Sequence, residues 1–321
     1  MPLETNDNTG HIPVLAPQVL ELLTPRPGQI CVDCTIGRGG HSTQIAQRLS
    51  PGGHLVGIDR DSQNVEHSRQ LLKQSAPKNV TWNLVHANFS ELTDVLAHLN
   101  IDKTDLLLAD LGFSSNQMND PNRGFSFGAT GPLDMRYDLG QELTAAQLVN
   151  TLDERSLADL IYQNGQERLS RKIAAKIIDR RRQAPIKDTM ALAQIVRSAY
   201  GSVASRSRGR RVPRRIDPAT RTFMALRIAV NRELDCLQHL LHQLPNVLQP
   251  GGVAVIISFH SLEDRLVKTA FRDLDRSGQA KLLTRRPLTA TDDERKTNRR
   301  SRSAKLRAIC FESRTSEPVM A

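Results

Sequence analysis

A glycine-rich segment between two apolar runs constrains the fold of this chain more than any other feature. Residues 37–42 read Gly-Arg-Gly-Gly-His-Ser and directly follow an apolar run at 29–33. A second apolar run, at 54–58, ends in Asp59, 19 residues after Gly40. Glycines let backbone approach a ligand that side chains would block, and an acid at about this distance binds ribose hydroxyls in βαβ nucleotide sites. The pattern predicts a strand–loop–helix–strand unit that binds an adenosine-containing cofactor.

The residues around the glycines narrow the kind of cofactor. No Gly-Lys-Ser or Gly-Lys-Thr follows the loop, so nucleoside triphosphate hydrolysis is disfavoured. His41-Ser42-Thr43 follow Gly40, so the G-x-G-x-x-G spacing of dinucleotide sites is missed as well. An adenosine ligand without phosphates, such as S-adenosylmethionine, is therefore favoured over a pyrophosphate ligand. The alternatives are a nicotinamide dehydrogenase, or a tight turn without a ligand.

Length and composition limit the class of protein. A chain of 321 residues with 39% hydrophobic residues can bury one large core, or one core plus an inserted domain. No apolar run approaches the roughly 20 residues that span a bilayer, and the polar start at 1–10 is unlike a signal peptide. We therefore expect a cytoplasmic protein. Cys31 and Cys34 form a C-x-x-C without a second pair, which favours small buried fillers and no metal site.

Charge indicates a polyanionic partner. The formal net charge is +10, and basic residues crowd two stretches, at 205–215 and 295–307. A solvated surface is the usual explanation of one basic run, but two clusters on a basic protein favour nucleic acid. Arg210 and Arg211 in the first cluster are candidate RNA contacts.

The order of elements predicts two domains. Apolar strands at about 30–34, 54–58, 80–85 and 105–110 alternate with helices, which is typical of a parallel sheet covered on both faces. A loop at 111–140 and helices from about 144 to 200 interrupt this pattern. A long helix at 218–243, a strand at 253–258 and a helix at 262–272 then resume it. We predict a discontinuous sheet domain, 1–124 and 216–321, with a helical domain inserted at 125–215. Much of 287–303 is expected to be disordered, and 304–311 to form an edge strand.

Residues that could bind a ligand or take part in catalysis follow three of the predicted strands. Ligands of open parallel sheets bind at the carboxyl ends of the strands. The glycine loop, Asp59 and the segment 110–115, Asp-Leu-Gly-Phe-Ser-Ser, should meet there. Methyltransferases that act on exocyclic amines carry an acid, amide or hydroxyl residue, two small or rigid residues and an aromatic residue in such a segment. The amine lone pair is delocalised into the base, so hydrogen-bond acceptors must aim it while an aromatic ring stacks on the extruded base. Asp110 would be the catalytic acceptor and Phe113 would stack. Alternatively, Asp110 caps a turn and Phe113 packs in the core.

Eight sequence blocks occur in order between about 11 and 272. They are HIPVL (11–15), GRGGHS (37–42), IDRD (58–61), DLGFSS (110–115), RGFSF (123–127), GPLDMR (131–136), PATRTF (218–223) and ISFHSLEDR (257–265). In these blocks the chain resembles the bacterial family of 16S rRNA cytosine-N4 methyltransferases of the MraW/RsmH type. Two departures are Ile36, where the family usually has phenylalanine, and Asn116, where many members have proline.

The resemblance implies the Rossmann-like α/β fold of S-adenosylmethionine-dependent methyltransferases, with an inserted all-helical domain that recognises RNA. It also implies methylation of a cytidine amino group in the rRNA of the small ribosomal subunit. His260 and Glu263 would shape the target pocket, or serve as a cap or in the core. The implied cofactor contacts are Gly39, Gly40, His41, Asp59, Phe89, Asp110 and Gln117.

Two further functions stay open from the sequence. A DNA amino-methyltransferase would use the insert for target recognition. A noncatalytic RNA-binding protein would keep a vestigial cofactor pocket.

Overall fold

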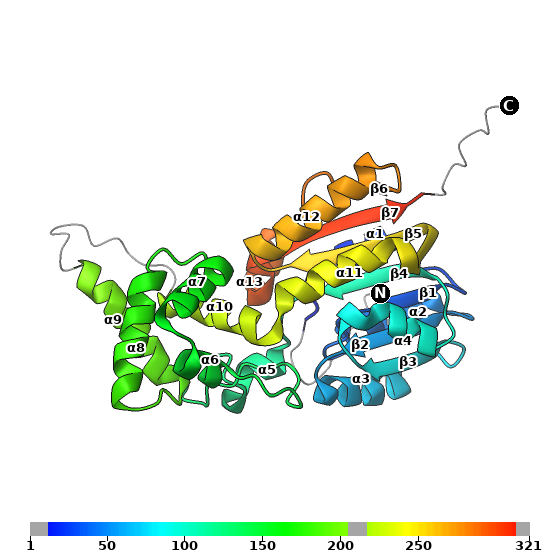
Figure 1. Cartoon of the computed structure of the whole chain (residues 1–321). Coiled ribbons are helices and arrows are strands. Elements are labelled where there is room, and N and C mark those ends of the chain that lie inside the picture. The colour runs from blue at the N-terminus through cyan, green and yellow to red at the C-terminus, as the bar shows by residue number, and fades with distance from the viewer. Residues whose placement is uncertain (1–11, 205–216, 313–321) are drawn as a thin grey trace. The chain divides into compact units, whose positions relative to one another are not determined.

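The computed structural model describes residues 12–204 and 217–312, and divides the chain into two compact units (Figure 1). The sheet unit comprises the chain up to Gly112 and from Leu234 onward, and the helical unit spans Phe113–Glu233. In the sequence, the helical unit is inserted between two neighbouring strands of the sheet.

The sheet unit contains seven strands in the order β3-β2-β1-β4-β5-β7-β6. The first five are parallel: β1 Ile30–Asp33, β2 His54–Asp59, β3 Thr81–His86, β4 Thr104–Asp110 and β5 Leu248–Ser258. β7 Lys305–Phe311 is antiparallel to β5, and β6 Ala280–Leu282 is antiparallel to β7. The strand order reverses between β1 and β4, which is the switch point where doubly wound sheets bind ligands.

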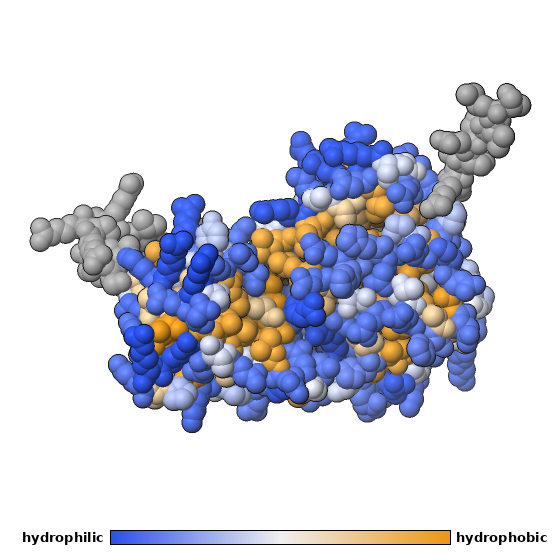
Figure 2. Space-filling model, viewed as in Figure 1, coloured by the Kyte–Doolittle hydropathy of each residue, from blue (hydrophilic) through white to orange (hydrophobic). Residues whose placement is uncertain are grey.

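Helices cover both faces of this sheet, as the continuous apolar strands predicted (Figure 1). Side chains alternate along each strand, so Cys31 faces one layer and Val32 the other. One layer is formed by α1 Ala16–Leu23, α2 Gly40–Leu49 and α3 Ser62–Ser75. The other is formed by α4 Leu92–His98, α11 Glu233–Val247 and α12 Ser261–Arg276. The outer side of α12 is hydrophilic in Figure 2, while Val267 and Phe271 are buried.

The helical unit has its own apolar core. Its helices are α5 Ser115–Asn119, α6 Ala145–Thr151, α7 Glu154–Gly165, α8 Ser170–Gln183, α9 Thr189–Ala204 and α10 Ala219–Asn231. Leu157, Ile173 and Ile177 are completely buried in this core. α7 and α10 approach closely at Gly165, where a Cβ would lie 2.6 Å from the carbonyl oxygen of Arg221.

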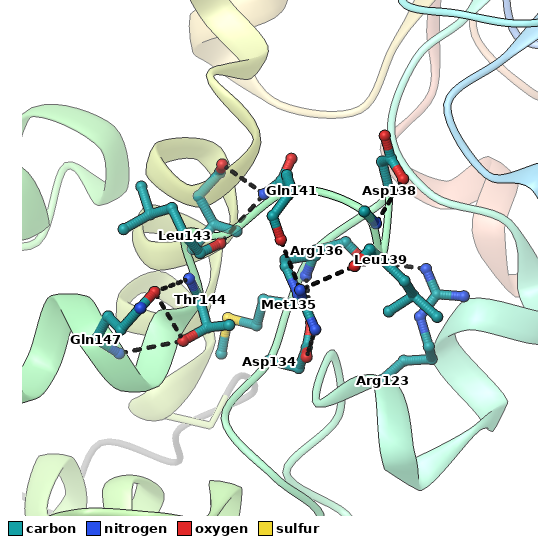
Figure 3. Close-up of polar contacts among 12 residues, drawn as sticks. Arg123, Asp134, Met135, Arg136, Asp138, Leu139, Gln141, Leu143, Thr144 and Gln147 are labelled. Atoms are coloured by element: carbon teal, nitrogen blue, oxygen red, sulfur yellow. Dashed lines mark hydrogen bonds and ion pairs between the residues drawn. The ribbon is translucent and has the colours of Figure 1, made fainter.

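Arginine side chains order the loop before α6, which contains the GPLDMR block (Figure 3). Arg136 donates to both carboxylate oxygens of Asp134, at 2.9 and 2.7 Å, and to the carbonyls of Leu139 and Gln141. Arg123 is buried and donates to the carbonyl of Arg136 at 3.0 Å. Much of this block therefore serves to fold the loop.

The single helix predicted at 218–243 is wrong, because the chain breaks it at Arg232. Arg232 has a left-handed backbone (φ 50°) that ends α10, and α11 starts at the next residue. The buried Asn231 explains the break, since it donates to the carbonyl of Met135 and accepts from the N–H of Tyr137, both at 2.7 Å. α10 thus belongs to the helical unit, whose bounds of 113–233 are wider than the predicted insert of 125–215.

The expected disorder at 287–303 is also wrong. This stretch forms α13 Asp292–Thr297 and a 3-10 turn, η3, at Arg299–Ser303. Glu294 accepts from the N–H of Leu15 at 2.8 Å, and Asn298 donates to the carbonyl of Ile12 at 2.9 Å. The strand predicted at 304–311 exists as β7, but it is not at the edge, because β6 lies outside it.

Three further observations concern the sequence predictions. Cys31 and Cys34 are buried free thiols, and burial raises the pKa of both well above the usual thiol value. Within the described residues, no helix combines the length and apolarity needed to cross a bilayer. The cluster at 205–215, with Arg210 and Arg211, lies outside the described residues.

Candidate functional site

The candidate site lies at the carboxyl edge of the sheet, around the end of β1. Asp33, the last residue of β1, pairs in register with Gly57 of β2 and Leu108 of β4. Asp59 and Asp110 end those two neighbouring strands. The glycine loop that follows β1 therefore begins between two strands that each end in a carboxylate.

The glycines are required by the backbone of this loop. Gly37 and Gly39 have φ angles of 51° and 80°, in the left-handed region that glycine tolerates best. α2 then starts at Gly40, where a Cβ would lie 3.3 Å from the ring of Pro13. The loop thus allows close packing at the start of a helix, whose first N–H groups lack partners within the helix.

Asp59 holds this loop in place. Its carboxylate accepts from the N–H of Gly37 at 2.8 Å, from the N–H of Asp61 at 2.8 Å and from the amide of Asn64 at 3.3 Å. Burial raises the pKa of Asp59 to about 6 despite these hydrogen bonds. Two carboxylate oxygens offer about four acceptor sites, so capacity for a ligand hydroxyl remains.

Asp110 is connected to the end of β1 by a polar network. Its N–H donates to the hydroxyl of Thr35 at 2.6 Å. The Thr35 N–H in turn donates to Asp33 at 3.1 Å, and the Ser42 hydroxyl donates to Asp33 at 2.6 Å. Burial raises the pKa of Asp33. Sequence reasoning missed Thr35, Asp33 and Ser42, although an acid at the end of an apolar strand was a usable signal.

His41 and Asp110 present buried polar atoms without hydrogen bonds. His41 Nε2 lies 3.7 Å from Asp110 Oδ2, and both side chains are mostly buried. Neither His41 Nε2 nor Asp110 Oδ1 has a hydrogen-bond partner among the described residues. Leaving such atoms unpaired costs about 1–3 kcal/mol each, so they fit a ligand that supplies polar groups.

Phe89 follows β3 at the same edge of the sheet. It starts a 3-10 turn, η1 Phe89–Glu91, and is half-buried against the apolar layer of α4 and α11. Since β3 adjoins β2, an apolar side chain lies one strand beyond Asp59.

Phe113 and Gln117 belong to the helical unit, where both already have packing or capping partners. The ring of Phe113 stacks on Phe125, with centroids 5.7 Å apart, and the guanidinium of Arg227 lies 4.9 Å from the Phe113 centroid. Gln117 is buried, and its side-chain oxygen accepts from the N–H of Ser114 at 2.9 Å in a capping box. These contacts favour the packing interpretation of Phe113.

His260 and Glu263 form the N-terminal cap of α12. Glu263 accepts from the N–H of Phe259 at 2.8 Å, and His260 Nδ1 accepts from the N–H of Glu263 at 3.4 Å. The next residue, Asp264, accepts from Lys305 at 3.0 Å and Arg307 at 2.7 Å. Burial opposes ionisation of Asp264, but these two donors keep its pKa below the usual value.

A doubly wound sheet with a glycine loop between two strand-end carboxylates defines an α/β protein built to hold an adenosine-type ligand. The chain belongs to the MraW methylase family, whose sequence model matches residues 8–312. It therefore has the α/β methyltransferase fold that the sequence predicted, with a helical insert.

Named relatives agree with this family. A protein of Koribacter versatilis named "Ribosomal RNA small subunit methyltransferase H" is 48% identical over 304 residues, which cover 93% of each chain. A protein of the same name from Solibacter usitatus is 44% identical, over 93% of this chain and 99% of the relative. Among solved structures, a SAM-dependent O-methyltransferase of Thermotoga maritima covers 97% of this chain and 71% of its own, at 8% identity and a TM-score of 0.43. That last likeness is too low to carry an argument.

Proposed function

We propose that this protein uses S-adenosylmethionine to methylate the N4 amine of a cytidine in 16S rRNA of the small ribosomal subunit. Family membership and the names of the relatives support an rRNA methyltransferase. The observation that carries the proposal is the carboxyl edge of the sheet. There the glycine loop, Asp59, and the buried unpaired atoms of His41 and Asp110 surround the end of β1.

The residues at this edge fit the parts of the cofactor. Asp59 would accept hydrogen bonds from the ribose hydroxyls, and Phe89 would form an apolar wall for the adenine. The backbone of Gly39 and Gly40, together with His41, would contact the methionine portion. The family resemblance implies Gln117, which belongs to the helical unit, as a further contact through its side-chain amide. When bound, S-adenosylmethionine supplies a sulfonium methyl group that an amine can displace.

Asp110 would position the target amine. The lone pair on cytosine N4 is delocalised into the ring, so the nitrogen is a weak nucleophile. A carboxylate that accepts one of its N–H groups holds the nitrogen in line for attack and favours tetrahedral geometry. The backbone of Asp110 is fixed by its hydrogen bond to Thr35, which suits this positioning role. The helical unit would hold the RNA, with Arg210 and Arg211 as candidate contacts.

Methyl transfer from radiolabelled S-adenosylmethionine tests the proposal. We expect label in 30S particles that lack the modification, and recovery of the label as N4-methylcytidine after digestion to nucleosides. Label found only in duplex DNA would instead support a DNA amino-methyltransferase. Calorimetry that detects RNA binding but no S-adenosylmethionine binding would support a noncatalytic RNA-binding protein.

A further inference from the structure

The C-terminal segment 283–304 lies at the same edge of the sheet as the candidate site. β7 is antiparallel to β5, and its first residue, Lys305, pairs with Ser258 at the carboxyl end of β5. Beyond β6, the chain continues along β7, where Leu288 and Leu306 exchange backbone hydrogen bonds of 2.9 Å. The turn after β6 and the η3 turn before β7 therefore both lie toward the edge where β1, β2 and β4 end.

This segment is firmly attached to the sheet unit. Glu294 and Asn298 bind the backbone of Leu15 and Ile12, as described above. Ala290 and Ala304 are buried in the same apolar layer as Leu15. These contacts hold the backbone that carries the neighbouring basic side chains at defined positions.

Most of the positive charge in this segment is not neutralised. Residues 285–304 include seven basic and three acidic residues. Asp292 pairs with Arg295 at 3.3 Å and Asp293 with Lys296 at 2.9 Å, while the carboxylate of Glu294 accepts from the backbone of Leu15.

Four exposed cations of the segment have no acidic partner among the described residues, and we call them the edge arginines: Arg285, Arg286, Arg299 and Arg302. The side chains of Arg285, Arg286 and Arg299 make no hydrogen bond with any residue that the structure describes. Arg302 donates only to the carbonyl of Arg295, at 3.3 Å. Without an acidic partner, these four cations gain no ion-pair stabilisation from the described part of the fold.

We propose that the edge arginines dock the phosphate backbone of the rRNA substrate against the sheet unit. Guanidinium groups bind phosphate through paired hydrogen bonds, and neutralised phosphates release counterions. The proposal rests on the proposed function, because it gives the RNA a second binding surface in addition to the one on the helical unit. A fixed basic surface at the carboxyl edge would hold the strand next to the methyl-transfer site.

A matched pair of charge variants tests this surface. The edge variant carries Arg285→Gln, Arg286→Gln, Arg299→Gln and Arg302→Gln. The control carries Arg26→Gln, Arg48→Gln, Lys73→Gln and Lys78→Gln. The four control residues are also exposed and lack acidic partners in residues 12–204 and 217–312, but they lie before β1 and β3 or in the last turns of α2 and α3. Both variants lose four positive charges.

The measurement is the affinity for 30S particles as a function of salt concentration, together with the calorimetric affinity for S-adenosylmethionine. If each edge arginine contacts one phosphate, the slope of log K against log salt becomes shallower by about 3. The control should keep most of the wild-type slope, and both variants should bind S-adenosylmethionine like the wild type.

The proposed docking surface is contradicted if the edge variant keeps the wild-type dependence of affinity on salt. It is also contradicted if the control variant loses as much of this dependence as the edge variant. If the fourfold edge variant does not fold, a variant with only Arg285→Gln and Arg286→Gln replaces it. About half the change in slope is then expected, and an unchanged slope would again contradict the proposal. Failure of the proposed function looks different, because the wild-type protein itself would then not methylate 30S particles.

Discussion

At the scale of single residues, Asp59 has one structural role and one proposed binding role. It orders the glycine loop through the N–H of Gly37, and it is the candidate acceptor for the ribose hydroxyls. Burial raises the pKa of its carboxyl to about 6, so the group changes charge just below neutral pH. Because the folded protein binds this proton more tightly than the unfolded chain, the contribution of Asp59 to stability falls as pH rises from about 4 to 6.

The titration of Asp59 should appear in cofactor binding. An ionised carboxylate accepts ribose hydroxyls better than a protonated one, so affinity for S-adenosylmethionine should fall as pH drops through about 6. With this pKa, the loss between pH 7 and pH 5 approaches about tenfold. Calorimetry across this range measures it, with Asp59→Asn as the comparison. A variant that keeps the full pH dependence would assign the titration to another group.

Thr35 should act through Asp110. Thr35→Val keeps the shape of the side chain but removes the hydroxyl that accepts the N–H of Asp110. Because the target amine must be held accurately, we expect kcat to fall about tenfold or more, with a smaller effect on S-adenosylmethionine affinity. Thr35→Ser restores the acceptor and should recover most of kcat. If serine is as slow as valine, the hydroxyl is not the positioning group.

At the scale of elements, the sequence predicted those helices and strands that a local pattern of apolar residues determines. β1 to β4 and their helices were recognisable from apolar runs and helical spacing. The α10–α11 break was not, because it depends on Asn231 binding the distant residues Met135 and Tyr137. β6 and α13 were not predicted either, because β6 is only three residues long and α13 is held by contacts with residues 12 and 15.

The candidate site also has parts that local sequence patterns predicted and parts that depend on contacts between distant residues. The glycine loop and the acids Asp59 and Asp110 were readable as strand-end motifs. The link from Asp33 through Thr35 to Asp110 was not, because it depends on the register of β1 against β4. The caps formed by Gln117 and His260 also required coordinates, since the sequence left a capping role for His260 as one of several.

The attachment of α13 can be tested through Glu294. Glu294→Ala leaves the N–H of Leu15, a fully buried residue, without its acceptor. We expect the free energy of unfolding to fall by about 1–3 kcal/mol, and the Leu15 amide to exchange its hydrogen faster. Glu66→Ala is the control, because the contacts that Glu66 makes within the described part of the chain are exposed and lie on α3. Unchanged exchange at Leu15 would show that α13 does not hold this segment.

At the scale of the whole molecule, two separate cores share one chain. The sheet unit buries its apolar residues in two layers, and the helical unit buries a third group of its own. The chain leaves the sheet after β4 and returns through α11 to β5. This arrangement lets the helical unit vary without interrupting the sheet, whose strands β4 and β5 remain paired neighbours.

Separate cores should unfold separately. Leu107 and Leu157 are completely buried in the sheet unit and the helical unit respectively. Replacing either with alanine should destabilise its own unit by about 2–5 kcal/mol. Urea unfolding followed by hydrogen exchange should then show protection lost mainly in the unit that carries the substitution. Equal loss in both units for both variants would mean that the chain unfolds as one cooperative body.

The contact of Glu294 and Asn298 with residues 12–15 has a consequence for biosynthesis. Pro13 packs against Gly40, so the segment beside the glycine loop is secured by residues translated more than 270 positions later. A nascent chain can form β1 to β4 early, but this bracing of the loop must wait until α13 leaves the ribosome. Polypeptides cut short before α13 would therefore carry every loop residue and still lack the support that holds Pro13 in place.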